Sequence, residues 1–158
     1  MKTRLVTRRL IPLTAALAIV LTATSAVSAA NRRVEGCARE FEIAERTDME
    51  SFREFEAETF RPIRHADAVT IFASGDAFFG IEEIIEVLEG FHFGPREAIW
   101  MWTEFYRVVD GCKSAFILYE TTYELPSIGF RSHALTGVTY THQGRRWLAI
   151  ADQGMPLP

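Results

Sequence analysis

The chain of 158 residues has few cysteines and histidines, and it lacks the motifs of several common enzyme classes. Among its four histidines, His65, His92 and His142 are expected in loops or at a strand end, without the spacing of metal ligands. No glycine-rich phosphate loop is present, and no Ser or Cys lies in a nucleophile motif such as G-x-S-x-G. We therefore expect neither a metal ion nor a cofactor.

The sequence also lacks an excess of positive charge. It contains 17 basic and 21 acidic residues, and four of the basic residues (positions 2, 4, 8 and 9) belong to an N-terminal leader without acids. The rest of the chain has 13 basic and 21 acidic residues, a formal net charge of −8. This charge argues against nucleic acid or an anionic membrane as a partner.

The leader has the order of a secretory signal peptide: a basic segment, an apolar run at residues 10–21, and small residues up to Ala30. The apolar run is shorter than the roughly 20 residues of a membrane anchor, which is the alternative. We expect cleavage after Ala29 or Ala30, so that residues 1–30 are removed and 31–158 form one exported domain. A weak twin-arginine pattern leaves the Sec and Tat routes both open.

Only two cysteines occur, Cys37 and Cys112, and both lie outside the leader. An exported chain meets an oxidising compartment, where two cysteines can form one disulfide. Such a bond would stabilise the fold by about 4–5 kcal/mol if its effect is the lost entropy of the unfolded chain. The alternative is a pair of buried free thiols.

The second half of the chain is rich in strand-forming residues. Four segments with many β-branched and aromatic residues, each ending at a turn signal, are predicted as strands: Ala98–Asp110, Ser114–Glu124, Phe130–His142 and Arg146–Gln153. The first half shows helical spacing and one hairpin, which predict helices Val34–Arg46, Met49–Phe60 and Ile81–Leu88 and short strands Asp67–Phe72 and Ala77–Phe79. Thr47 and Asp48 offer N-cap oxygens for the second helix. This order is typical of an α+β fold, with the helices on one face of the sheet.

Three segments, taken in order, resemble landmarks of the nuclear-transport-factor-2-like (NTF2-like) superfamily and, within it, of the SnoaL-like group: His65–Val69, Phe79–Ile84 and Gly144–Ala149. The resemblance covers about Val34–Gln153. It implies an NTF2-like (cystatin-like) cone, a strongly curved antiparallel sheet wrapped around three helices from the N-terminal half, with a pocket at the open end. Members of the superfamily act as isomerases, dehydratases, cyclases or epoxide hydrolases, or bind ligands and partners. The resemblance therefore implies a place for a site but no single reaction.

The turns predict which strand residues face one another. With loops at 111–112, 125–129 and 143–144, one sheet face would carry the pocket-lining residues Trp102, Glu104, Tyr106, Tyr119 and Thr121, together with His133, Leu135, Leu148 and Asp152. The other face would carry Phe116, Glu120, Val138, Trp147 and Ala149. We expect the first face to be concave, because it combines aromatic side chains with convergent polar groups.

On that face, His133 and Asp152 would form a diagonal pair with Cα atoms roughly 7–8 Å apart. A carboxylate can fix the tautomer of a histidine and raise its basicity, so these two residues are the predicted catalytic acid–base pair. A satisfied polar contact without a catalytic role is the alternative.

The sequence thus predicts an exported protein that binds a small apolar molecule in an apolar pocket. If the protein is an enzyme, proton-transfer chemistry of the isomerase, cyclase or dehydratase type fits these residues. The alternative is a non-catalytic interaction or dimerisation module, in which one sheet face packs against a second copy to form a homodimer.

Overall fold

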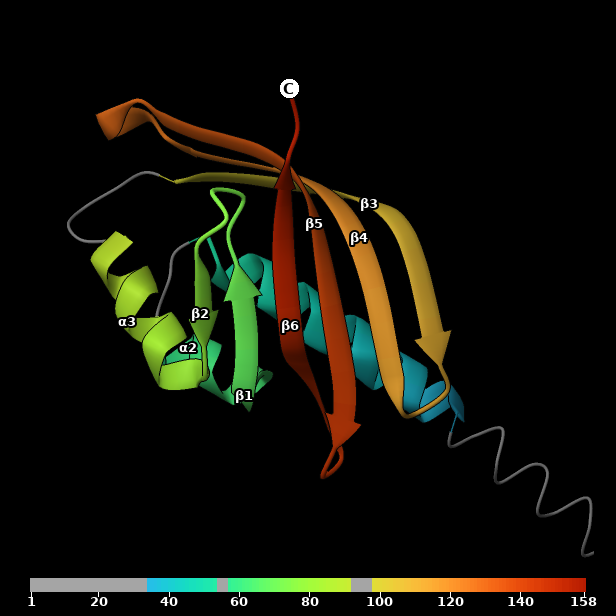
Figure 1. The fold of residues 1–158 in the computed structure, drawn as a ribbon. Coiled ribbons are helices and arrows are strands. Elements are labelled where there is room, and N and C mark those ends of the chain that lie inside the picture. Colours follow the sequence, from blue (N-terminus) through green and yellow to red (C-terminus); the bar gives the residue numbers. More distant parts are fainter. Residues whose placement is uncertain (1–33, 54–56, 92–97) are drawn as a thin grey trace, which may run out of the picture. The chain divides into compact units, whose positions relative to one another are not determined.

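The computed structural model describes residues 34–53, 57–91 and 98–158 (Figure 1). The predicted signal peptide, His92 and part of the predicted second helix lie outside these residues. Contacts divide the chain into residues 1–35 and the compact unit Gly36–Pro158, and the description below concerns that unit. Among the described residues, no helix is long and apolar enough to cross a bilayer.

The first helix is described from residue 34 to residue 51, so it continues through the predicted break at Thr47 and Asp48. The hydroxyl of Thr47 donates to the carbonyl of Ile43 at 2.8 Å, which is a bond within the helix. The side chain of Asp48 is buried, with 1% of the residue exposed, and does not cap a helix. The prediction that a second helix begins at Met49 is therefore wrong.

Two shorter helical segments follow before the sheet begins: α2 (Ala57–Phe60) and the 3₁₀ turn η1 (Arg61–Ile63). A longer helix, α3 (Ile81–Phe91), lies where the apolar stripe predicted one. Its inward residues Ile84 and Leu88 are buried in a cluster with Phe60. The predicted third helix is confirmed.

Within the described residues, six strands form one sheet in the order β2-β1-β6-β5-β4-β3. Their bounds are Arg64–Ile71 (β1), Ala77–Phe79 (β2), Ile99–Asp110 (β3), Ser114–Leu125 (β4), Phe130–Gln143 (β5) and Arg146–Pro156 (β6). The pair β1–β6 is parallel, so the prediction of a purely antiparallel sheet is corrected to a mixed sheet. The chain crosses through α3 to the far edge strand β3 and then meanders back, which brings β6 beside β1 in the same direction.

The sheet curves around the first helix, which crosses the inner face of β3–β6 (Figure 1). One core cluster lies between this helix and the sheet and includes Phe41, Met49, Ile117, Tyr140 and Trp147. The predicted disulfide is confirmed: Cys37 on the first helix is bonded to Cys112 in the β3–β4 turn, across a sequence separation of 75. The bond fastens one end of the helix to the sheet.

The register predicted for the first hairpin, β3 with β4, is correct only in part. Glu104 lies opposite Tyr119, as the turn predicted. A bulge between Glu104 and Tyr106 then shifts the pairing by one residue. Tyr106 therefore moves to the outer face, where 55% of it is exposed. Arg107 lies opposite the core residue Ile117 instead.

The register predicted for the second hairpin is wrong by one residue. The 3₁₀ turn η2 (Pro126–Ile128) and Gly129, whose φ of 68° is left-handed, close the loop early enough for Leu125 to pair with Phe130. His133 therefore lies opposite Thr122 instead of Thr121. Because strand side chains alternate, this slip places His133 and Leu135 on the outer face.

The last hairpin turns one residue later than predicted. Gly144 and Arg145 both have positive φ, at 58° and 67°, and form the two-residue turn. The pairing of β5 with β4 is also shifted by one residue. Trp147 and Ala149, which were predicted for the outer face, are therefore buried in the core under the first helix. Val138 was also predicted for the outer face, and it is buried in the same core.

A second bulge, between Thr139 and Tyr140, shifts the register once more and places Asp152 opposite Val138. Asp152 is therefore on the inner face, as predicted, although the register that predicted it was wrong.

Candidate functional site: an apolar cavity with a buried arginine between two aspartates

A cavity of about 600 Å³ is lined by residues of the first helix, α2, α3, the β1–β2 turn and all strands of the sheet, and Arg131 and His133 of β5 are among them. This volume is within the range of small-molecule sites, about 300–1,000 Å³. Much of the wall is apolar and includes Met49, Phe52, Phe60, Phe72, Phe78, Leu88, Trp100 and Phe130. The polar side chains in the wall include Asp48, Arg64, Thr70 and Asp152. The cavity thus combines an apolar surface with a small group of charges.

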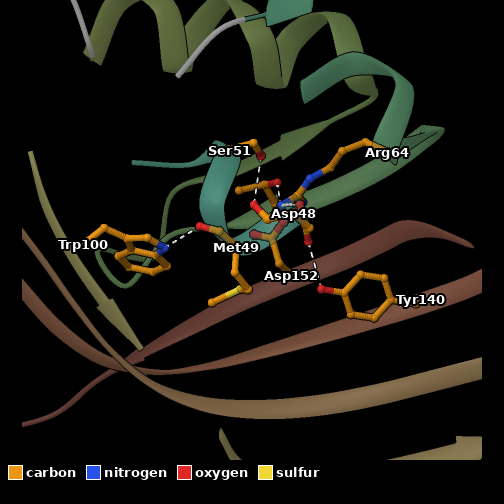
Figure 2. Close-up of polar contacts among 8 residues, drawn as sticks. Asp48, Met49, Ser51, Arg64, Trp100, Tyr140 and Asp152 are labelled. Atoms are coloured by element: carbon orange, nitrogen blue, oxygen red, sulfur yellow. Dashed lines mark hydrogen bonds and ion pairs between the residues drawn. The ribbon is translucent and has the colours of Figure 1, made fainter. Parts of the chain in front are cut away.

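The centre of the polar group is Arg64, which binds two carboxylates at once (Figure 2). One terminal nitrogen, Nη2, donates to Oδ1 of Asp48 at 2.9 Å, and the other, Nη1, donates to Oδ2 of Asp152. Thr70 donates to the same oxygen of Asp152 at 3.0 Å, and Tyr140 donates to Oδ2 of Asp48 at 3.0 Å. Three acidic and basic groups are therefore held in one hydrogen-bonded cluster.

The three charged members of the cluster come from three different elements. Asp48 lies near the C-terminal end of the first helix, Arg64 is the first residue of β1, and Asp152 lies in β6. The parallel pairing of β1 with β6 places Thr70 directly opposite Asp152. Tyr140, from β5, completes the cluster. The arrangement depends on the mixed sheet and could not form in the purely antiparallel sheet expected from the sequence.

The charges of the cluster are largely removed from water. The exposed fractions of the side chains are 1% for Asp48, 7% for Arg64 and 14% for Asp152. Burial raises the pKa of Asp48 above its usual range, against the opposing effect of the Arg64 charge. Burial alone would lower the pKa of Arg64, but the charges of Asp152 and Asp48 raise it, so the guanidinium stays protonated. One cation faces two carboxyl groups, which favours a proton on Asp48.

One hydrogen-bond donor of Arg64 is unsatisfied among the described residues. Its Nε is buried and, among the described residues, has no hydrogen-bond partner. The guanidinium lies over the ring of Phe60, with its carbon 4.5 Å from the ring centre, so apolar surface covers one side. An unsatisfied buried donor costs about 1–3 kcal/mol.

A second polar cluster joins the first helix to the edge strand β3. Glu45 accepts hydrogen bonds from the hydroxyl of Tyr119 at 2.7 Å and from Nη2 of Arg107 at 2.9 Å. Arg107 also binds Glu104, with Nη2 2.6 Å from Oε2. Burial and the nearby Glu45 raise the pKa of Tyr119, so its hydroxyl stays protonated and donates. These residues connect helix and strand and are not among the described residues that line the cavity.

The predicted catalytic pair does not form. His133 and Asp152 both border the cavity, but Nε2 of His133 lies 2.9 Å from Oε1 of Glu120 on the outer face, whereas Asp152 binds Arg64 and Thr70 on the inner face. The one-residue slip between β4 and β5 separates them, since it moves His133 to the other side of the sheet.

The predicted pocket residues have different positions. Thr121 lines the cavity and donates to the carbonyl of Ala134. Trp102 packs against the core cluster, and Tyr106 faces outward beyond the bulge. Glu104 and Tyr119 belong to the Glu45 cluster described above.

Sequence reasoning missed Asp48, Arg64 and Tyr140. Asp48 was expected to cap a helix, which is the ordinary role of an aspartate beside a threonine. Arg64 precedes the strand-like segment and has no helical or strand spacing that relates it to either aspartate. The one available signal was an acidic residue on the inner stripe of a continuous helix, since acids are rarely buried without a partner.

Comparison with known proteins identifies the fold. No protein-family profile matches the chain, and no curated protein matches it in sequence. An NTF2-like protein of unknown function from Pseudomonas putida KT2440 superposes with a TM-score of 0.64 at 16% identity, covering 75% of this chain and 86% of that one. A domain of unknown function with a cystatin-like fold from Nostoc punctiforme gives 0.63 at 14% identity, covering 78% of each chain.

A third similar structure is an NTF2-like protein from Streptomyces avermitilis that carries a provisional name as a dehydratase. It gives a TM-score of 0.64 at 11% identity and covers 78% of this chain and 99% of that one. Identities this low show the fold alone. The chain therefore has the NTF2-like, cystatin-like α+β fold that the sequence resemblance implied.

Proposed function

We propose that this protein binds a small, largely apolar molecule whose polar end reaches the Asp48–Arg64–Asp152 cluster. One observation carries the proposal: a cavity of about 600 Å³ has a largely apolar wall that also includes the polar residues Asp48, Arg64, Thr70 and Asp152. Binding sites typically combine a mostly apolar surface with a few placed polar groups. The proposal includes membership of the SnoaL-like group and export, supported by the sequence landmarks and the leader.

The charge of the cluster restricts the polar end of the ligand. Arg64 supplies one positive charge against two carboxyl groups, so the cluster is neutral with Asp48 protonated and carries −1 with both ionised. An anionic group would meet no net attraction there. A carbonyl or hydroxyl oxygen can accept a hydrogen bond from Arg64, and a hydroxyl can also donate to Asp152.

Proton transfer on such a ligand is the enzymatic form of the proposal. Asp152 lines the cavity and accepts from Arg64 and Thr70, while burial favours the protonated form of Asp48. Two carboxyl groups with different environments can serve as base and acid. The reaction class is isomerisation, cyclisation or dehydration, with Asp152 as proton acceptor in place of the His133–Asp152 pair.

Filling the cavity is expected to abolish ligand binding while the fold survives. Ser132 is half-buried and lines the cavity, so Ser132→Trp should weaken binding of an uncharged, environment-sensitive naphthalene dye by at least about tenfold, or 1.4 kcal/mol. The dye titration is followed by fluorescence, and circular dichroism checks the fold. Thr103→Trp, at an exposed position of β3 outside the cavity, should leave the affinity unchanged. Equal dye affinity in both variants would contradict the proposed site.

A second candidate function is assembly through the outer face of the sheet. Met101, Tyr106 and Val108 expose 53%, 55% and 47% of their surface on the edge strand β3. The neighbouring strands carry the ion pairs His133–Glu120 and Arg131–Glu124 on the same face. A surface with apolar residues and charges of both signs can pack against a second copy of itself around a two-fold axis.

Charging this outer face is expected to separate such a dimer. Met101→Glu should shift the protein from dimer to monomer in sedimentation velocity, because it buries a carboxylate in the contact. Ile43→Glu introduces the same charge at a position of the first helix that is 62% exposed, and it should leave the dimer intact. A wild-type chain that sediments as a monomer at high concentration would exclude this function.

A further inference from the structure

The disulfide lies beside two further residues that can bind metal. Nε2 of His142 is 4.0 Å from Sγ of Cys37, and it is also 4.0 Å from Oε2 of Glu40. The ligand atoms of Cys37, Glu40 and His142 all lie within 4.8 Å of one another. Cys112 contributes a fourth atom, because its sulfur is bonded to that of Cys37.

We propose that reduction of the Cys37–Cys112 disulfide creates a zinc site in which Cys37, Cys112, His142 and Glu40 are the four ligands. Two thiolates, one imidazole and one carboxylate are ligand types that Zn²⁺ binds in tetrahedral sites. Bond lengths of about 2.0–2.3 Å place tetrahedral ligand atoms roughly 3.3–3.8 Å apart. The ligand atoms of Cys37, Glu40 and His142, which lie within 4.8 Å of one another, must therefore approach by up to about 1.5 Å, and the two sulfurs must move apart once their bond is broken.

The fold brings the four residues together from three places. Cys37 and Glu40 are three residues apart on the first helix and share one of its faces. Cys112 lies in the β3–β4 turn, and His142 lies near the end of β5. The backbone N–H of His142 donates to the carbonyl of Lys113 at 2.8 Å, which ties the end of β5 to that turn.

Neighbouring groups hold the ligands in place independently of the disulfide. The ring of Trp147 lies 5.1 Å from the ring of His142, and its Nε1 donates to the carbonyl of Cys37 at 3.1 Å. Side chains packed around metal ligands fix their orientation and raise affinity. His142 is 18% exposed and Glu40 59% exposed, so a metal ion can reach the site from solvent.

The site can form only after the disulfide is reduced, and the reductant that we propose is a dithiol. The dithiol transfers two electrons and two protons to the S–S bond: its own sulfurs form a disulfide, and Cys37 and Cys112 become thiols. Zn²⁺ then replaces the two thiol protons, which pass to the buffer. In the oxidised protein the sulfurs are bonded to each other and offer no thiolate, so the two forms exclude each other.

The test uses cobalt as a spectroscopic substitute for zinc on the full chain. The protein is reduced with a phosphine, which takes an oxygen atom from water to become the phosphine oxide and does not compete as a thiol ligand. One Co²⁺ per reduced chain should give the thiolate-to-cobalt charge-transfer band and the visible bands of tetrahedral cobalt. Added Zn²⁺ should remove both, and the oxidised protein should show neither. A reduced protein without the charge-transfer band would overturn the proposal.

Two variants distinguish the proposed four-ligand site from metal binding by the two cysteine thiolates alone. His142→Ala should weaken cobalt binding by at least about tenfold, since even residues behind the ligands contribute that much. His133→Ala removes another half-buried histidine paired with an acid and should change nothing. Unchanged cobalt affinity in His142→Ala would refute the assignment. If reduction unfolds the chain, recovery of the near-ultraviolet circular dichroism on adding Zn²⁺ supports the site, and failure to recover contradicts it.

Discussion

Replacing Arg64 by methionine is expected to lower the free energy of unfolding by about 3–5 kcal/mol at neutral pH. Arg64 is the cation that both Asp48 and Asp152 contact, and methionine leaves those carboxyl groups in the apolar interior without it. The change is measured by urea unfolding with tryptophan fluorescence. The matched control is Arg61→Met, whose partner Glu82 is 75% exposed, and an exposed pair contributes about 0–1 kcal/mol. A loss of equal size in both variants would contradict the buried role.

The loss in the Arg64 variant is expected to depend on pH. Burial raises the pKa of Asp48 in the folded chain above 3.8, and removing the Arg64 charge raises it further. A carboxyl group with a raised pKa binds a proton on folding, so the folded chain is favoured in acid and loses stability as the pH rises through that pKa. The difference between wild type and variant should therefore be small in acid and grow toward neutral pH. If the difference in unfolding free energy did not change with pH, the loss would come from the packing of the Arg64 side chain and not from its charge.

The elements of this fold could be predicted from local patterns, whereas the register of the strands could not. The apolar stripe of α3 and the β-branched runs of β3–β6 are short-range signals, because each reflects burial of one face of one element. The register depends on where a turn closes and on bulges. Gly129, Gly144 and Arg145 can adopt left-handed backbone, but the sequence did not show which loop residues would use it. The one-residue error between β4 and β5 moved the side chains of β5 to the other face, and the bulge in β3 did the same to Tyr106.

The candidate site depends on those same long-range features. Arg64 meets Asp152 because β1 and β6 are parallel neighbours, and Asp152 faces inward because a bulge restores its side. Asp48 meets Arg64 because the first helix does not end at Thr47. None of these three conditions has a local signal, so the sequence predicted a pocket lined by inner-face residues and one of its acids, but not its central cation.

The Cys37–Cys112 disulfide is expected to contribute strongly to the stability of the fold. Replacing Cys37 and Cys112 together by alanine is expected to lower the free energy of unfolding by about 4–5 kcal/mol, because the unfolded chain regains the entropy that a closed loop of this length removes. The sequence separation of 75 makes this loop long, and longer loops confine the unfolded chain more. Guanidinium unfolding measures the change, with a chelator present so that no metal contributes.

The control for this variant uses the wild-type disulfide. A phosphine reductant should shift the unfolding midpoint of the wild type toward that of the double variant and leave the double variant unchanged. Cys37 is buried among Phe41 and Trp147, so alanine also removes a little packing, and the variant should be the less stable of the two reduced chains. A double variant within about 1 kcal/mol of the oxidised wild type would contradict the loop-entropy account and would mean that residual structure already confines the unfolded chain.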